Sequence, residues 1–145
     1  MFHAVIDTNV LVSALLNMES NPGKVLLSVF NGETVPLMNE EIMTEYRDVL
    51  AREKFHFPAE LVDVILKRLA ASSLSVSAPS TEFPEVGDPK DRRFYAVTMS
   101  GRDAAAAVLV TGNIRHFPVK PFVVTPAQFV AMLQAGEAHR STPMI

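Results

Sequence analysis

The chain has 145 residues, of which 48% are hydrophobic and 20% are charged, and this indicates one globular domain and excludes a disordered segment. It has no cysteine, no apolar run near the roughly 18 residues of a membrane span and no basic N-terminal signal segment, so we exclude disulfide and thiolate chemistry and expect a cytoplasmic protein. The 13 basic and 16 acidic residues give a net charge of −3, which by itself argues against a partner bound through its phosphates.

The first half of the chain alternates apolar runs with helical periodicity. The run at 2–7 predicts a buried strand that ends in a carboxylate, Asp7, and Thr8 or Asn9 can cap the next helix. Asn39 is a good cap for a later helix. The predicted order is a strand at 2–7, a helix at 8–16, a turn at 21–23, a helix at 24–31, a strand at 34–38 and helices at 39–50 and 58–69. The last helix has an apolar stripe: Leu61, Val64, Ile65, Leu66 and Leu69.

The second half continues the alternation and completes an α/β domain. A strand is predicted at 73–78 and a Pro/Ser-rich surface loop at 78–87, after which Asp88 or Asp91 begins a helix that Gly101 ends. Further strands are predicted at 105–111 and 119–125, and a final helix runs from Pro126 to near Gly136. We therefore predict one domain at 1–136, a mostly parallel sheet with helices on both faces, and a loose tail at 137–145.

Acidic side chains stand where the predicted topology places a ligand site. In such sheets, ligands bind outside the carboxyl ends of the strands. Asp7 ends the first strand and Asn113 follows a later one, while helix starts and a crossover helix can bring Asp91 and Glu45 to the same edge. Because these are oxygen donors without cysteine or organised histidines, they suit Mg²⁺ or Mn²⁺. An Asp after a strand is, however, often only a helix cap.

Four segments together carry a family resemblance that spans residues 2–125. They read VIDTNVLVS at 5–13, EYRDVL at 45–50, DPKDRRF at 88–94 and LVTGN at 109–113. The chain resembles the PIN domain, the ribonuclease fold found in VapC-like toxins of toxin–antitoxin pairs. The resemblance implies a three-layer α/β fold and a metal-dependent endoribonuclease that hydrolyses single-stranded RNA.

The resemblance also implies roles for individual residues. Asp7, Glu45 and Asp91 match the metal-binding acids of the family. The fourth acid of the family is replaced by Asn113, which supplies an amide oxygen but no charge. The polar residues Thr8, Asn9 and Thr111 match those that orient acids and water around the site. Thr8 and Asn9 can also be explained as helix caps alone.

Other polar residues keep two interpretations. Asp88 can cap its helix or join the site, and Glu41 can lie near the site or in solvent. His116 can meet RNA or serve only its loop. No Ser–His–Asp arrangement is indicated, because Ser13 lies within an apolar helix.

The charge distribution bears on partners. Residues 88–120 carry a net charge of +3, and their arginines are candidates for RNA backbone contacts: Arg92, Arg93, Arg102 and Arg115. Without the three predicted metal ligands, acidic and basic residues are equal in number, so the net charge does not exclude RNA. The resemblance further implies an antitoxin partner and a homodimer.

Two alternatives to a nuclease remain. Asn113 in place of an acid is compatible with a catalytically impaired module that acts by binding RNA or protein. A phosphatase of the haloacid dehalogenase type needs a second Asp two residues after the first, and that position holds Asn9. The phosphatase therefore ranks lowest.

Overall fold

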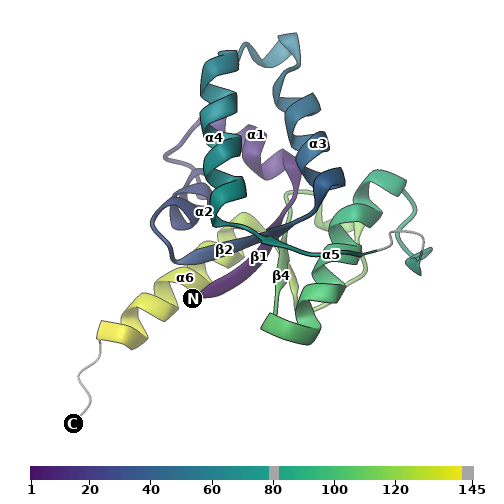
Figure 1. Cartoon of the computed structure of the whole chain (residues 1–145). Coiled ribbons are helices and arrows are strands. Elements are labelled where there is room, and N and C mark those ends of the chain that lie inside the picture. Colours follow the sequence, from purple (N-terminus) through teal and green to yellow (C-terminus); the bar gives the residue numbers. More distant parts are fainter. Residues whose placement is uncertain (79–81, 142–145) are drawn as a thin grey trace.

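The computed structural model describes the backbone of residues 1–78 and 82–141 and the side chains of residues 1–78 and 82–136. Within this part of the chain, five strands form one parallel sheet in the order β3-β2-β1-β4-β5 (Figure 1). The strands are β1 (Phe2–Ile6), β2 (Thr34–Met38), β3 (Leu74–Ser75), β4 (Val108–Val110) and β5 (Val123–Val124). The predicted α/β fold with a parallel central sheet is confirmed.

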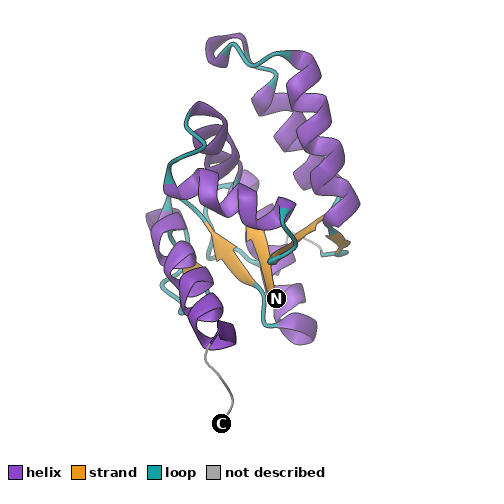
Figure 2. Ribbon diagram, turned by 90° about the vertical axis from the view of Figure 1, so that its left-hand side faces the viewer, coloured by secondary structure: helices purple, strands orange, loops and turns teal. Residues whose placement is uncertain are grey.

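Helices cover both faces of this sheet. They are α1 (Thr8–Leu16), α2 (Asn21–Phe30), α3 (Glu40–Leu50), α4 (Ala59–Ser72), α5 (Pro89–Ala105) and α6 (Pro126–Ser141), with short 3₁₀ turns η1 (Glu53–Phe55) and η3 (Ile114–His116). Helix α5 packs against β1, β2 and β4, whereas α2 contacts both α1 and α6. Helices α3 and α4 form a hairpin that projects beyond the sheet (Figures 1 and 2).

No helix in the described part of the chain has the length and apolar character needed to cross a membrane.

The central strands are short apolar runs that are buried on both faces, as parallel strands between two helical layers must be. Val5, Ile6 and Val110 are each at most 1% exposed. In the register of β1 and β4, Ile6 faces Val110, so the residues that follow them lie at the same edge. The backbone N–H of Asp7 donates to the carbonyl of Val110 at 2.9 Å, which extends the ladder to the first polar residue.

A buried tyrosine fixes α3 against the end of β1. The hydroxyl of Tyr46 donates to the carbonyl of Ile6 at 2.5 Å, and the Tyr46 side chain is 1% exposed. Because Glu45 precedes Tyr46 and Asp7 follows Ile6, this one hydrogen bond also brings two predicted site residues toward each other.

The start of α2 differs from the predicted turn at 21–23. The chain is already helical at Asn21, because the side chain of Ser20 accepts from the N–H of Gly23 at 3.2 Å and Pro22 lies in the first turn. A Cβ at Gly23 would meet the carbonyl oxygen of Met18 at 2.1 Å, so glycine serves here for close backbone approach.

Two predicted helix ends were also wrong. Helix α5 continues through Gly101 to Ala105, and Ala106 with φ of 50° follows it. Gly101 lies inside the helix, where a Cβ would meet the Leu37 side chain at 2.9 Å, so glycine here serves close packing rather than a helix end. Helix α6 continues past Gly136 to Ser141. The division between a domain at 1–136 and a tail at 137–145 stays a prediction, and 142–145 lie outside the described residues.

Smaller differences concern caps, stripes and strand lengths. Asp7, rather than Thr8 or Asn9, occupies the N-cap position of α1.

The buried stripe of α4 contains Val62 with Ile65, Leu66 and Leu69, whereas Leu61 and Val64 are exposed. Strands β3, β4 and β5 are shorter than predicted because pairing extends over only a few residues. Part of the predicted 78–87 loop, residues 79–81, lies outside the described residues.

Replacing Tyr46 with Phe should destabilise the protein by about 1–3 kcal/mol, because a buried carbonyl acceptor loses its partner. Urea unfolding would measure this loss. The matched control is Tyr95→Phe: Tyr95 is 2% exposed, and its hydroxyl makes no hydrogen bond to a described residue. An equal loss in both variants would show that the Tyr46 hydroxyl has no special role.

Candidate active site

A cavity of about 410 Å³ opens at the carboxyl edge of the sheet, between the ends of β1 and β4 and the helices α1, α3 and α5. Its acidic lining consists of Asp7, Glu45, Asp88 and Asp91. Asn113 and His116 close one side. The cavity therefore collects all four residues that the sequence predicted to be catalytic: Asp7, Glu45, Asp91 and Asn113.

Asp7 is the buried centre of this cavity, with 6% of its surface exposed. One of its carboxylate oxygens, Oδ2, accepts from the hydroxyl of Thr111 at 2.7 Å and from the amide of Asn9 at 3.3 Å. Burial, partly offset by the Thr111 hydrogen bond, raises the pKa of Asp7 to about 6, and the charges of Asp91 and Glu45 add to this rise. The two hydrogen bonds thus leave part of the cost of a buried anion uncompensated.

Glu45 is held in place by the first residue of α1. The hydroxyl of Thr8 donates to Oε2 of Glu45 at 2.5 Å. Thr8 is 6% exposed and lies next to Asp7 in the chain, so the same strand end positions both carboxylates. The predicted role of Thr8 in orienting an acid agrees with this contact, whereas its predicted role as a cap does not.

Asp91 enters the cavity from the first turn of α5. Its Oδ2 lies 3.3 Å from Nδ1 of His116. Burial raises the pKa of Asp91, and the nearby charge of Asp88 adds to the rise, whereas His116 lowers it. Asp88 itself is the N-cap, because its side chain accepts from the N–H of Lys90 at 2.9 Å.

The loop after β4 is fastened to α1 by hydrogen bonds. The N–H of Gly112 donates to Oδ1 of Asn9 at 3.0 Å, and the N–H of Asn113 donates to the hydroxyl of Thr111 at 2.9 Å. A Cβ at Gly112 would lie 3.2 Å from Oδ1 of Asn9. Asn9 and Thr111 therefore link the loop to Asp7 and set where Asn113 stands.

The donor chemistry of the cavity fits a hard divalent cation. Carboxylate oxygens predominate, and burial, with a smaller contribution from neighbouring carboxylates, raises the pKa values of Asp7 and Asp91. Within the described residues, no three His, Asp or Glu side chains form a ready-made metal cage. Asp7, Glu45 and Asp91 therefore line one cavity, and the charges of Glu45 and Asp91 act on Asp7. To hold an ion, their side chains would have to turn toward it.

The four arginines predicted to contact RNA do not line the cavity. Arg92 donates to the carbonyls of Val86 and Gly87, and Arg93 pairs with Glu41 at 3.4 Å. Arg102 donates to the carbonyl of Ala107 at 2.9 Å and lies over the ring of Phe122. Arg115 lines a separate hollow beside η3. Their contact with RNA stays a prediction.

Three other residues with suitable chemistry line the cavity instead: Arg52, Phe55 and Lys90. The sequence held a signal for one of them. Val49 and Arg52 follow Glu45 at intervals of four and seven residues, which places them on one helical stripe. The position of Phe55 depends on the turn after α3, and no short-range pattern identifies it.

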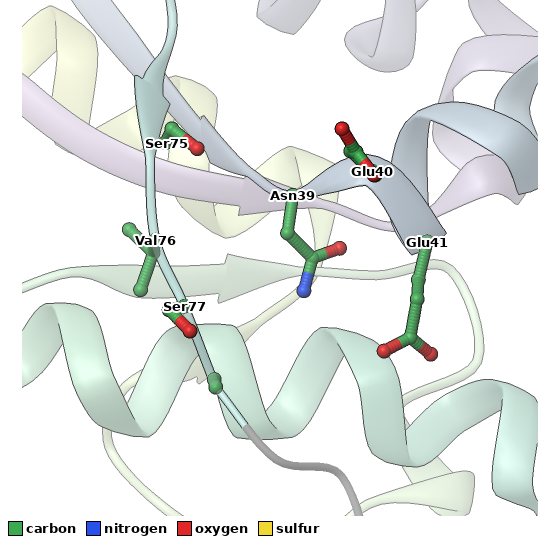
Figure 3. Close-up of a pocket in the computed structure, with 7 residues that line it drawn as sticks. Asn39, Glu40, Glu41, Ser75, Val76 and Ser77 are labelled. Carbon is green, nitrogen blue, oxygen red and sulfur yellow. The ribbon is translucent and has the colours of Figure 1, made fainter.

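A second and larger hollow, of about 640 Å³, lies beside the ends of β2 and β3 (Figure 3). It contains Asn39, Glu40 and Glu41, and the two glutamate side chains point in different directions. Both glutamates are exposed, and Glu41 is paired with Arg93. This hollow thus lacks the buried, uncompensated charge that distinguishes the cavity around Asp7.

Comparison with known proteins agrees with the resemblance seen in the sequence. The family model described as PIN domain matches residues 3–115, which include Asp7, Glu45, Asp91 and Asn113. The chain belongs to the PIN domain family. It is also 34% identical over 111 residues to an uncharacterized protein of Methanocaldococcus jannaschii, with 75% of this chain and 69% of that protein covered. No solved structure matches the chain. PIN domains are generally nucleases, so membership of the family indicates a hydrolase of the nuclease type.

Without metal, Asp7→Asn should stabilise the protein at neutral pH. The folded state binds a proton on Asp7 more tightly than the unfolded state, because the pKa rises from 3.8 to about 6. Wild-type stability should therefore fall by up to about 3 kcal/mol as the pH rises from below 4 to above 6. The variant, which has no carboxyl group to ionise at this position, should lack that fall.

Urea unfolding between pH 4 and pH 8, with EDTA present, measures the effect. The exposed acid Asp48, on α3 outside the cavity, supplies the control Asp48→Asn. Parallel pH profiles for Asp7→Asn and wild type would contradict the raised pKa of Asp7.

Proposed function

We propose that this PIN domain protein is a metal-dependent endoribonuclease that hydrolyses phosphodiester bonds of single-stranded RNA. The observation that carries the proposal is the buried carboxylate of Asp7 in a cavity that it shares with Glu45 and Asp91. A nuclease must neutralise a phosphate, and crowded carboxylates with raised pKa values favour recruitment of a cation.

In this proposal, Asp7, Glu45 and Asp91 hold Mg²⁺ or Mn²⁺, and Asn113 assists through its amide. Such an ion lowers the pKa of a bound water and offsets negative charge on the phosphate. The chain supplies orientation: Thr111 and Asn9 hold the carboxylate of Asp7.

Thr8 holds the carboxylate of Glu45 in the same way. These hydrogen bonds keep both carboxylates at the cavity, so only local turns of the side chains are needed for an ion to bind.

The biological setting is part of the proposal. The resemblance to VapC-like proteins supports a toxin of a toxin–antitoxin pair that acts in the cytoplasm, forms a homodimer and is blocked by an antitoxin protein. Growth arrest on expression, relieved by co-expression of the product of an adjacent small gene, would support this setting. Growth unaffected by the active protein would contradict it.

Cleavage of a labelled single-stranded RNA should require Mg²⁺ or Mn²⁺ and cease with EDTA. Asp7→Asn, Glu45→Gln and Asp91→Asn should each lower the rate by about 100-fold or more, because each removes a charge that holds the ion. Asp48→Asn and Asp103→Asn, on the same helices but outside the cavity, are matched controls. Metal-independent cleavage, or full activity of Asp7→Asn, would overturn the proposal.

The alternative of a catalytically impaired binding module rests on Asn113, which supplies no charge where the family resemblance expects an acid. Calorimetric titration with Mn²⁺ separates the two. If Asn113 faces the ion, Asn113→Asp should tighten Mn²⁺ binding by about tenfold, since a carboxylate replaces an amide. Unchanged affinity would place Asn113 away from the ion, and metal binding without cleavage of any RNA would favour the module.

A further inference from the structure

The cavity extends beyond its carboxylates into a groove between α1 and α3. Val12 and Ser13 of α1 form one wall, and Val49 of α3 forms the other. Arg52 and Phe55, just past the end of α3, close the far end. Arg52 follows Glu45 by seven positions and lies just past the end of α3, so the groove leads along the helix from the acidic end to a basic and aromatic end.

The ring of Phe55 is held in this groove without being part of the core. Phe57 packs against the core, and the Phe55 ring stacks on it with centroids 5.6 Å apart and an interplanar angle of 14°. His56, with φ of 55°, makes the turn between the two rings. The fold thus presents a half-buried aromatic ring at a fixed position in the cavity wall, which is the arrangement used to stack an unpaired base.

The basic residues around this groove are free to meet phosphate. Neither Arg52 nor Lys90 has an ion-pair partner within residues 1–78 and 82–136. Both are exposed and line the cavity, Arg52 at its far end and Lys90 beside Asp91. The exposed side chain of Lys54 lies over the Phe55 ring, with Nζ 5.1 Å from the ring centroid, and a base that stacks on this face would displace it toward solvent and phosphate. Arg92, Arg93 and Arg102, by contrast, are engaged by the fold.

From this arrangement, we propose that the groove is a substrate-binding subsite in which Phe55 stacks on one base of single-stranded RNA while Arg52 and Lys90 contact the phosphates on either side of the cavity. The inference rests on the proposed function and deepens it, because it names the residues that position the strand. Stacking on a ring requires an unpaired base, so the subsite selects single strands over duplexes.

The chain offers a direct reporter because it contains no tryptophan. Phe55→Trp places the sole tryptophan of the chain in the groove and keeps an aromatic ring there. In an Asp7→Asn background, which keeps the RNA intact, a short single-stranded RNA should quench this fluorescence. Leu27→Trp, at an exposed position of α2 outside the cavity, is the control and should show no quenching. Equal quenching in both variants, or none at position 55, would overturn the subsite.

The salt dependence of RNA binding should distinguish stacking on Phe55 from the phosphate contacts of Arg52 and Lys90. Phe55→Ala should weaken RNA binding about 5- to 150-fold, the usual effect of losing one stacked base, and should leave the salt dependence unchanged. Arg52→Gln and Lys90→Gln should each lower the slope of log K against log salt concentration by about 0.7, the value for one phosphate contact on a single strand. Arg47→Gln and Lys120→Gln, outside the cavity, are the matched controls.

Binding by fluorescence anisotropy distinguishes failure of the subsite from failure of the proposed function. If wild type cleaves RNA but Phe55→Ala and Arg52→Gln bind like their controls, the subsite is wrong and the nuclease stands. If no RNA is cleaved but binding depends on Phe55 and Arg52, the subsite stands without the nuclease. Duplex RNA bound as tightly as single-stranded RNA would overturn the stacking role of Phe55.

Discussion

The site depends on a single constraint, the burial of one carboxylate at the end of a parallel strand. Asp7 is 6% exposed, and this burial raises its pKa to about 6. Thr111 and Asn9 hold it. Thr111 reaches it because β1 and β4 are adjacent and in register, and Asn9 lies two residues further along the chain. The Tyr46 hydrogen bond to Ile6 then brings α3 and Glu45 to the same strand end. The fold thus gathers carboxylates at a place where burial weakens their solvation.

The number of basic residues in a segment does not show which of them are available to bind phosphate. The segment 88–120 has a net positive charge, yet the structure engages several of its arginines in contacts with backbone carbonyls, with Glu41 and with an aromatic ring. Among the described residues, Arg52 and Lys90 line the cavity without an ion-pair partner, and Arg52 lies outside the segment 88–120. A net charge of −3 is therefore compatible with a local surface that attracts phosphate.

The parts of the fold that follow from local pattern were predictable. The alternation of apolar runs and helices predicted the parallel sheet. Asp7 and Asn113 were expected at one edge because parallel strands end together. The start of α2 and the end of α5 were missed because Gly23 and Gly101 serve close packing rather than turns. The position of Phe55 in the cavity wall was missed because it depends on tertiary stacking with Phe57 across the turn at His56.

The most direct test of this account is a residue-specific titration of the Asp7 carboxyl group by carbon NMR, with and without Mg²⁺. Without metal, we predict a midpoint near the value of about 6 that burial causes. With saturating Mg²⁺, the midpoint should move to markedly lower pH, because the ion stabilises the carboxylate. A metal-free midpoint near the ordinary 3.8, or a midpoint that Mg²⁺ leaves unchanged, would contradict the claim that buried charge at this strand end recruits the cation.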